Sequence, residues 1–232
     1  MMMNMNSVLV VAAHPDDEVL GCGGTIAKHV DMGDEVNVLL VAEGATSRAP
    51  IRDRDADKFQ LSELSKAAKK ARDILGVSNL SILELPDNRL DSMDRLDLIK
   101  IVESYIVKFR SSIIYCHHSG DVNVDHRRVH EAVVTASRPS PGQIVKSLFS
   151  FEVQSSTEWQ PPGSSFPFQP NYFVDISDQW ERKKAALVAY TDEMRPWPHS
   201  RSIEAVEYLA RWRGAQLGVH AAEAFCLMRS LK

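Results

Sequence analysis

The chain has 232 residues, of which 44% are hydrophobic and 25% are charged, and its formal net charge is −4 at pH 7. These values are ordinary for a globular protein and give no reason to expect nucleic acid or an anionic membrane as a partner. The length suits one α/β domain of generous size, or at most two small ones, and either can bury a sizeable core.

The cysteines and the N-terminal stretch bear on where the protein works. Cys22, Cys116 and Cys226 are widely separated, so they do not make a disulfide framework and indicate a reducing compartment. The opening MMMNMNSVLVVAA lacks a basic region and runs into acidic residues, which is typical of a first strand rather than a signal peptide. No run approaches the roughly 18 apolar residues that span a bilayer. We therefore expect a cytoplasmic protein without a membrane span.

Strand and helix patterns alternate along the first half of the chain. Four apolar runs are predicted to be strands, at residues 7–13, 35–42, 79–85 and 111–117. Such runs are typical of parallel strands that are buried on both faces. Helical patterns are found between them at residues 24–32, 55–75 and 92–109, the last with Ser92 as its N-cap. The alternation predicts an α/β fold, a Rossmann-like, mostly parallel sheet flanked by helices.

A long irregular loop is expected at residues 154–170, which are rich in proline, serine and aromatic residues. Loops of this length in compact domains often bind ligands or act as lids. We expect Trp159 and Phe166 to be anchors that pack the loop down; the alternative is that they cap a sugar ring.

The C-terminal part is expected to extend the same domain. Two helices are predicted near residues 177–194 and 202–217, and a short apolar segment follows at residues 222–228. Neither an internal repeat nor a clear boundary divides the chain, so we expect one domain over residues 1–232.

An acidic cluster follows the first predicted strand. His14, Asp16, Asp17 and Glu18 lie at its carboxyl end, where parallel α/β sheets bind their ligands. Like charges at short range raise one another's pKa, and a divalent cation removes this repulsion. His14 and Asp17 carry donor atoms that suit zinc, whereas Asp16 can face a metal-bound water. Glu18 is expected only to begin the helix.

A catalytic zinc usually takes three protein ligands, so a third is expected elsewhere in the chain. His126 opens a predicted helix after the fourth strand and projects from its inward face, near the same edge of the sheet. Asp125 could orient a ligand histidine. Spacing alone favours His126 but does not decide firmly against the other histidines nearby, which are His117, His118 and His130.

Two motifs make the sequence resemble a known family. AHPDDE at residues 13–18 and DVNVDH at residues 121–126 resemble motifs of the LmbE/PIG-L family of zinc-dependent de-N-acetylases, and LPDNRLD at residues 85–91 is similar to the family's segment after the third strand. The resemblance implies one zinc ion per chain, held by His14, Asp17 and His126. It also implies Asp16 as the general base.

The resemblance extends, with two departures, to residues that would contact substrate. Asp87 corresponds to a position that holds a sugar hydroxyl. Asn123 stands where many members have a histidine that assists the tetrahedral intermediate; the positive partner of the oxyanion is then expected to be His199, Arg201 or His118. Arg52, or Arg54 beside it, is a loose substitute for an arginine that some relatives have in the following helix.

The implied activity is removal of the N-acetyl group from a small N-acetylglucosamine-type conjugate. The metal-bound water would attack the amide carbonyl while Asp16 accepts its proton. Members of the family are commonly oligomeric, so a homo-oligomer is compatible with the resemblance.

Two other functions remain as alternatives. A metal-dependent phosphoesterase would use Asp121 and Asp125 to hold a second cation. A nucleotide-sugar-binding protein without hydrolase activity would use Asp87 and the glycines of GCGG at residues 21–24. That glycine run matches no phosphate-binding motif and is expected instead to allow close approach of the backbone at the mouth of the site.

Overall fold

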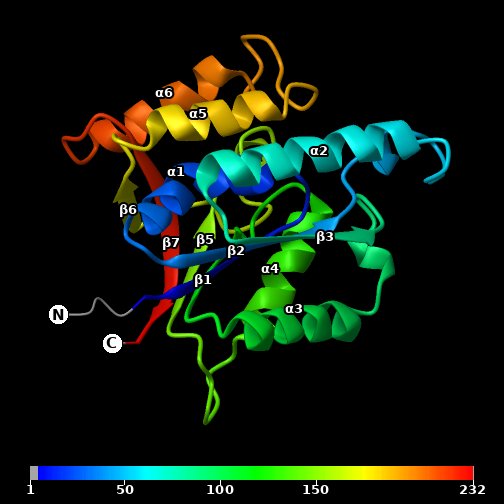
Figure 1. The fold of residues 1–232 in the computed structure, drawn as a ribbon, viewed down its shortest axis with the longest axis horizontal. Coiled ribbons are helices and arrows are strands. Elements are labelled where there is room, and N and C mark those ends of the chain that lie inside the picture. The colour runs from blue at the N-terminus through cyan, green and yellow to red at the C-terminus, as the bar shows by residue number, and fades with distance from the viewer. Residues whose placement is uncertain (1–4, 232) are drawn as a thin grey trace.

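The computed structural model describes residues 5–231 and contains a seven-stranded sheet among them (Figure 1). The strands lie in the order β3 (Asn79–Leu85), β2 (Glu35–Ala42), β1 (Ser7–Ala12), β4 (Ile113–His117), β5 (Ser147–Phe151), β7 (Ala222–Ser230) and β6 (Tyr172–Asp175). From β3 to β5 all neighbours are parallel, whereas β7 is antiparallel to both β5 and β6. The prediction of a mostly parallel α/β sheet is confirmed. Residues 1–4 and 232, at the ends of the expected domain, lie outside the described residues.

Helices cover both faces of the sheet. One face carries α1 (Asp17–Asp31), α2 (Lys58–Leu75) and α5 (Trp180–Ala189), and the other carries α3 (Arg95–Phe109) and α4 (Val124–Ala136) (Figure 1). Alternate residues of β1 serve the two cores: Val8 and Val10 belong to the first, Leu9 and Val11 to the second. All four are fully buried, as expected for a central strand with period-two alternation. None of the helices in residues 5–231 combines the length and apolar character needed to cross a membrane.

The chain order places a switch point between β1 and β4. The chain moves from β1 to β2 and β3 on one side and then returns with β4 on the other side of β1. Loops at the carboxyl ends of these two strands diverge, and the crevice between them is where open α/β sheets bind ligands. The segment His14–Asp17 follows β1, and the segment Asp121–His126 follows β4.

Several helix boundaries differ from the prediction. Helix α1 begins at Asp17 instead of residue 24, because its glycines hide the helical pattern. The N-cap of α3 is Asp94, whose side chain accepts a hydrogen bond from the Leu96 amide at 2.8 Å. Ser92 instead ends a short 3₁₀ turn, so its prediction as the cap is wrong. In α6 (Ile203–Ala215), Ser202 is the N-cap.

Helix α1 is interrupted at Cys22, whose backbone is not helical (φ −150°, ψ 25°). A buried ion pair fills the break: Lys183 Nζ lies 2.6 Å from Glu223 Oε1. Glu223 accepts hydrogen bonds from the amides of Gly24 and Thr25, and Lys183 donates one to the Leu20 carbonyl. The backbone groups that the break leaves without helical partners are thereby hydrogen-bonded inside the protein.

The neighbouring glycines pack against the core. A Cβ atom at Gly21 would lie 2.3 Å from Phe151, and one at Gly24 would lie 2.7 Å from Ile176. The expected close approach is therefore real, but it joins α1 to β5 and to the segment after β6. The glycines do not shape the mouth of the site.

Replacing Lys183 by Met should destabilise the fold strongly. The buried Glu223 carboxylate would lose its cation, and removing one partner of a buried pair costs about 3–5 kcal/mol. Chemical denaturation measures the change in free energy of unfolding. Lys66→Met is the control, because its pair with Glu63 is exposed on both sides and should contribute less than about 1 kcal/mol. Equal effects of the two substitutions would contradict this account of the break.

Candidate metal centre

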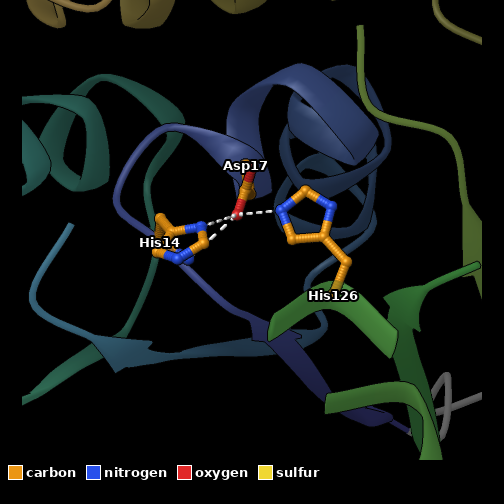
Figure 2. A group of neighbouring side chains, drawn as sticks. All are labelled: His14, Asp17 and His126. Atoms are coloured by element: carbon orange, nitrogen blue, oxygen red, sulfur yellow. Dashed lines mark hydrogen bonds and ion pairs between the residues drawn. The ribbon is translucent and has the colours of Figure 1, made fainter. Parts of the chain in front are cut away.

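Three side chains from the predicted set meet at the switch point. His14 Nδ1 lies 3.3 Å from Asp17 Oδ2, and His126 Nε2 lies 3.2 Å from the same oxygen (Figure 2). Ligand atoms in a tetrahedral zinc site at bond lengths near 2.0–2.1 Å are about 3.3 Å apart. Two of the three distances thus match a zinc ligand set, and all three ligand atoms lie within 4.8 Å of one another. They come from the loop after β1, from α1 and from α4.

The hydrogen bonding of this trio fits a cation. Asp17 Oδ1 and His126 Nε2 are both buried and have no hydrogen-bond partner. Unpartnered buried polar atoms are costly and rare. A cation bound by the trio would give His126 Nε2 a partner, and Asp17 Oδ1 is the second oxygen of the same ligand carboxylate. Carboxylate oxygen and imidazole nitrogen are ordinary zinc ligands. The residues present therefore fit the metal that the resemblance implies.

His14 is oriented from its far side by two carboxylates. Its Nε2 lies 3.0 Å from Asp125 Oδ2 and 3.1 Å from Asp87 Oδ1. A proton on Nε2 leaves Nδ1 as the nitrogen that faces Asp17, which is the arrangement by which carboxylates orient metal-binding histidines. The expected orienting contact of Asp125 is present in the structure.

Asp125 and Asp87 also form a second acidic group with His14, but their oxygens have other partners. Asp125 accepts the amides of Asn88 and Leu90 at 2.7 and 2.9 Å. Asp87 accepts the amide of Ser47 at 3.0 Å. These oxygens therefore already have hydrogen-bond donors. In the Asp121–Asp125 pair of the two-metal alternative, Asp121 likewise accepts from the hydroxyls of Ser156 and Thr157.

His126 is held on its other side by Asp121. Its Nδ1 lies 3.1 Å from Asp121 Oδ2, and Asp121 also accepts hydrogen bonds from the hydroxyls of Ser156 and Thr157. Burial lowers the pKa of His126, but the carboxylates of Asp17 and Asp121 outweigh it and raise the pKa to about 9. Asp121 thus ties the histidine to the loop after β5.

Replacing Asp121 by Asn should weaken zinc binding about 10- to 100-fold, because partners of this kind fix the orientation and basicity of a ligand histidine. Competition with a chromogenic chelator measures the zinc Kd. Asp97→Asn on the exposed first turn of α3 is the control and should leave the Kd unchanged. An unchanged Kd in Asp121→Asn would show that the contact does not support the metal.

Asp16 lies beside the trio in a strained backbone conformation. Its φ is 107°, in a region that residues with a Cβ rarely adopt, and such strain is concentrated at functional sites. Glu18 stabilises this conformation by accepting the Asp16 amide at 3.0 Å and the Tyr190 hydroxyl at 2.6 Å. Glu18 is 4% exposed and burial raises its pKa to about 7, so its expected role as a mere helix start is wrong.

The carboxylate of Asp16 is paired with Arg201. Arg201 Nη1 lies 2.8 Å from Asp16 Oδ2, and its Nε donates to Ser155 Oγ at 2.6 Å. Burial raises the pKa of Asp16 well above its usual value, whereas the guanidinium acts in the opposite direction. Arg201 thus favours the ionised form of a carboxylate that burial would otherwise protonate.

Four predicted substrate-contacting residues remain. Three of them contact the trio or its neighbours, and Arg52 does not. Asp87 is buried against His14, and Asn123 caps α4 while its amide donates to Asn88 Oδ1 at 2.9 Å. His199 Nδ1 accepts the amide of Arg201 at 3.0 Å. Arg52 instead binds Glu43 at 2.7 Å, and the structure shows no contact between it and the trio.

The histidines left open after β4 make other contacts. His117 Nε2 accepts the Ala13 amide at 2.8 Å and its ring stacks on that of His126. His118 Nε2 interacts with the Phe166 carbonyl, and His130 Nδ1 with the His117 carbonyl. The geometry therefore places His126 alone among them in the trio.

Several residues that support the site were not predicted from the sequence. Arg48 binds Glu193 at 2.5 Å, and Glu193 lies 3.9 Å from Arg201. Ser156 and Thr157 support Asp121 from a segment read only as loop. None of these residues belongs to a local motif. The pairs Arg48–Glu193, Ser156–Asp121 and Thr157–Asp121 each join residues more than 30 positions apart in the chain, so no short-range signal could have revealed them.

The part of the chain that carries this geometry matches a protein-family model. The model described as PIG-L, GlcNAc-PI de-N-acetylase, matches residues 9–137, more than half of the chain. The chain belongs to the PIG-L family. The matched region contains every residue of the trio as well as Asp16 and Asp87.

Curated relatives include several deacetylases of N-acetylated sugars. The diacetylchitobiose deacetylase of Thermococcus kodakarensis is 29% identical over 79% of this chain and 68% of its own length. A 1D-myo-inositol 2-acetamido-2-deoxy-alpha-D-glucopyranoside deacetylase of Gordonia bronchialis is 25% identical over 82% and 85%. The 4-oxalmesaconate hydratase of Pseudomonas putida is also 25% identical, over 84% and 79%. The expectation of a hydrolytic, amide-cleaving enzyme agrees with the deacetylases among them.

The fold also occurs in the solved structure of a deacetylase. N,N'-diacetylchitobiose deacetylase from Pyrococcus horikoshii superposes with a TM-score of 0.72 over 97% of this chain and 85% of its own. At 22% identity this likeness concerns the fold. It agrees with the sheet and helix layers described above.

Proposed function

We propose that the protein is a zinc-dependent deacetylase that removes the N-acetyl group from an N-acetylglucosamine-type conjugate, with one zinc ion per chain. One observation carries the proposal: His14, Asp17 and His126 converge with two unpartnered buried atoms, and the Asp16 carboxylate lies beside them without belonging to the trio. An arrangement of three ligands and a separate base suits hydrolysis of an amide. The free cysteines agree with a cytoplasmic site of action.

A zinc ion held by the trio would polarise the acyl carbonyl and lower the pKa of water at the site. Asp16 has the task of taking the proton from the attacking water and returning it to the departing amine. Arg201 keeps Asp16 ionised and fixes one of its oxygens, which leaves the other for the proton. Arg201 also places a positive charge beside Asp16, and this charge can stabilise the oxyanion in place of the histidine that many family members have where this chain has Asn123.

The β3–α3 segment and the start of α4 supply the polar groups for the sugar. Asp87, Asn88 and Asn123 are linked by hydrogen bonds on one side of His14. Asn123 and Asn88 offer amide donors and acceptors that suit sugar hydroxyls. We place the N-acetylated ring between this group and Arg201.

An acetate-release screen tests the proposal. Zinc-loaded protein should release acetate from at least one N-acetylated sugar conjugate in a panel of chito-oligosaccharides, inositol glycosides and malate glycosides. A sample treated with chelator should not, and addition of zinc should restore the release. Absence of acetate release from the whole panel by zinc-loaded protein would contradict the proposal.

A second candidate is hydration of an unsaturated polycarboxylate, as the name of the Pseudomonas putida relative describes for that protein. Arg48 and Arg201 both approach the carboxylate of Glu193, so this part of the site already binds a carboxylate between two cations. A substrate carboxylate would have to replace Glu193 there. Loss of the ultraviolet absorbance of 4-oxalmesaconate, without acetate release from any sugar, would favour this candidate.

A further inference from the structure

Trp159 is an exposed aromatic side chain on a firmly held base. It ends the 3₁₀ turn η3 (Thr157–Trp159) and is 54% exposed, although we expected it to pack the loop down. The preceding residues Ser156 and Thr157 are buried and are hydrogen-bonded to Asp121. The indole is therefore presented to solvent from a segment that is fixed to the metal centre through Asp121 and His126.

His199 lies against this indole. The two ring centroids are 5.9 Å apart, with planes at 75°. His199 Nδ1 accepts the amide of Arg201, so in the neutral imidazole the proton is on Nε2. An apolar aromatic face and a nitrogen that can donate a hydrogen bond thus stand side by side.

The pair is joined to the catalytic group through Arg201. Its guanidinium contacts Asp16 at 2.8 Å and Ser155 at 2.6 Å, and Ser155 belongs to the loop that carries Trp159. The loop after β5 and the segment before α6 therefore meet beside the Asp16 carboxylate. Trp159 and His199 come from the two segments that meet at this junction.

We propose that Trp159 and His199 form a subsite for a second pyranose ring, next to the ring whose N-acetyl group is cleaved. This rests on the proposed deacetylase function. A pyranose has an apolar C–H face that packs on an indole and hydroxyls that accept a hydrogen bond from imidazole, so the pair matches a sugar better than an acyl chain. The preferred substrate is then an N-acetylated oligosaccharide. Binding at this remote ring contributes to catalysis of the cleaved one.

A competing place for the second ring exists across the site. A cavity of about 300 Å³ lies between α2 and the end of α5, lined by Arg48, Phe59, Leu64, Lys70, Tyr190 and Glu193 among others. The ion pair between Arg48 and Glu193 forms the wall on the side of Arg201. Phe59, which is 73% exposed, is the exposed aromatic residue in the lining of that cavity and provides a matched control.

The test is the selectivity between N,N'-diacetylchitobiose and N-acetylglucosamine, taken as the ratio of their kcat/KM values in acetate release. Trp159→Ala should lower this ratio about tenfold, in line with the loss of one stacked ring. Trp159→Phe should restore most of it, and Phe59→Ala should leave it unchanged. An unchanged ratio in Trp159→Ala, or a fall in Phe59→Ala instead, would overturn the subsite.

A binding readout separates this inference from the proposed function. Titration of Asp16→Asn with N,N'-diacetylchitobiose should change the tryptophan fluorescence, and the change should vanish when Trp159→Phe is added. Trp212→Phe, which removes an equally exposed indole on α6, should leave it intact. If zinc-loaded protein with Asp16 intact releases no acetate but the Trp159-dependent signal is present in Asp16→Asn, the deacetylase proposal fails and the sugar subsite stands. A signal that persists without Trp159 overturns the subsite.

Discussion

Replacing Asp16 by Asn is expected to lower kcat for acetate release by about 10²–10⁴-fold, the usual contribution of a general base. Asn has the same shape and can still accept the hydrogen bond from Arg201 Nη1, but it cannot take a proton from water. Because the Asp16 carboxylate does not belong to the trio, zinc content should stay at one ion per chain. Steady-state kinetics and metal analysis on the same preparation measure both quantities.

The control for this substitution is a second carboxylate that is buried nearby. Glu18→Gln removes a charge from the same turn but keeps an oxygen that can accept the Asp16 amide. Its effect on kcat should be much smaller than that of Asp16→Asn. Full activity in Asp16→Asn, or loss of zinc from it, would show that Asp16 is not the base.

Removing His126 should abolish both zinc binding and activity. His126→Ala deletes one of three nitrogen and oxygen atoms that lie within 4.8 Å of one another, and a trio reduced to two ligands falls below the three that catalytic zinc sites use. The substitution also removes the imidazole that lies 3.2 Å from the Asp17 carboxylate. Zinc content after dialysis should be near zero, and acetate release should be undetectable.

His130→Ala is the matched control for His126. It removes a histidine one turn further along α4, whose Nδ1 interacts with the His117 carbonyl rather than with the trio. This variant should keep its zinc and most of its activity. If His126→Ala retained its zinc and His130→Ala lost it, the third ligand would be His130, and the assignment to His126 would be wrong.

Local patterns were enough to predict the centre of this fold. The strands β1 and β2 are buried on both faces, so their sequences are continuous apolar runs and stand out without any knowledge of their neighbours. The AHPDDE motif stands out for a related reason, because a concentration of charge at the end of such a run needs a compensating cation. The positions of His14 and Asp17 at the switch point follow from these two facts.

The parts that were missed depend on contacts between distant residues. Strand β5 is short, and its antiparallel neighbour β7 lies more than 70 positions further along the chain. The start of α1 contains glycines that disfavour helix, and it forms because Glu223 and Lys183 satisfy its break from the other end of the sequence. Such long-range partners leave no periodic signal.

Contacts between distant residues also limited what could be predicted of the site. Arg201 was one of several candidates for a positive partner, and only the folded chain shows that it contacts Asp16. Arg52 was chosen by its nearness to a family position, but its guanidinium is bound to Glu43. The composition of residues 154–170 correctly predicted an irregular segment, yet it could not say whether Trp159 would be buried or exposed.

The most direct test of the central claim is acetate release from N,N'-diacetylchitobiose in H₂¹⁸O by the zinc-loaded enzyme. The account predicts that each acetate carries one ¹⁸O atom, that one free amine appears for each acetate, and that chelated protein produces neither. Two results would contradict it: zinc-loaded protein that binds the sugar but forms neither product, or zinc-loaded protein that consumes the sugar by another reaction.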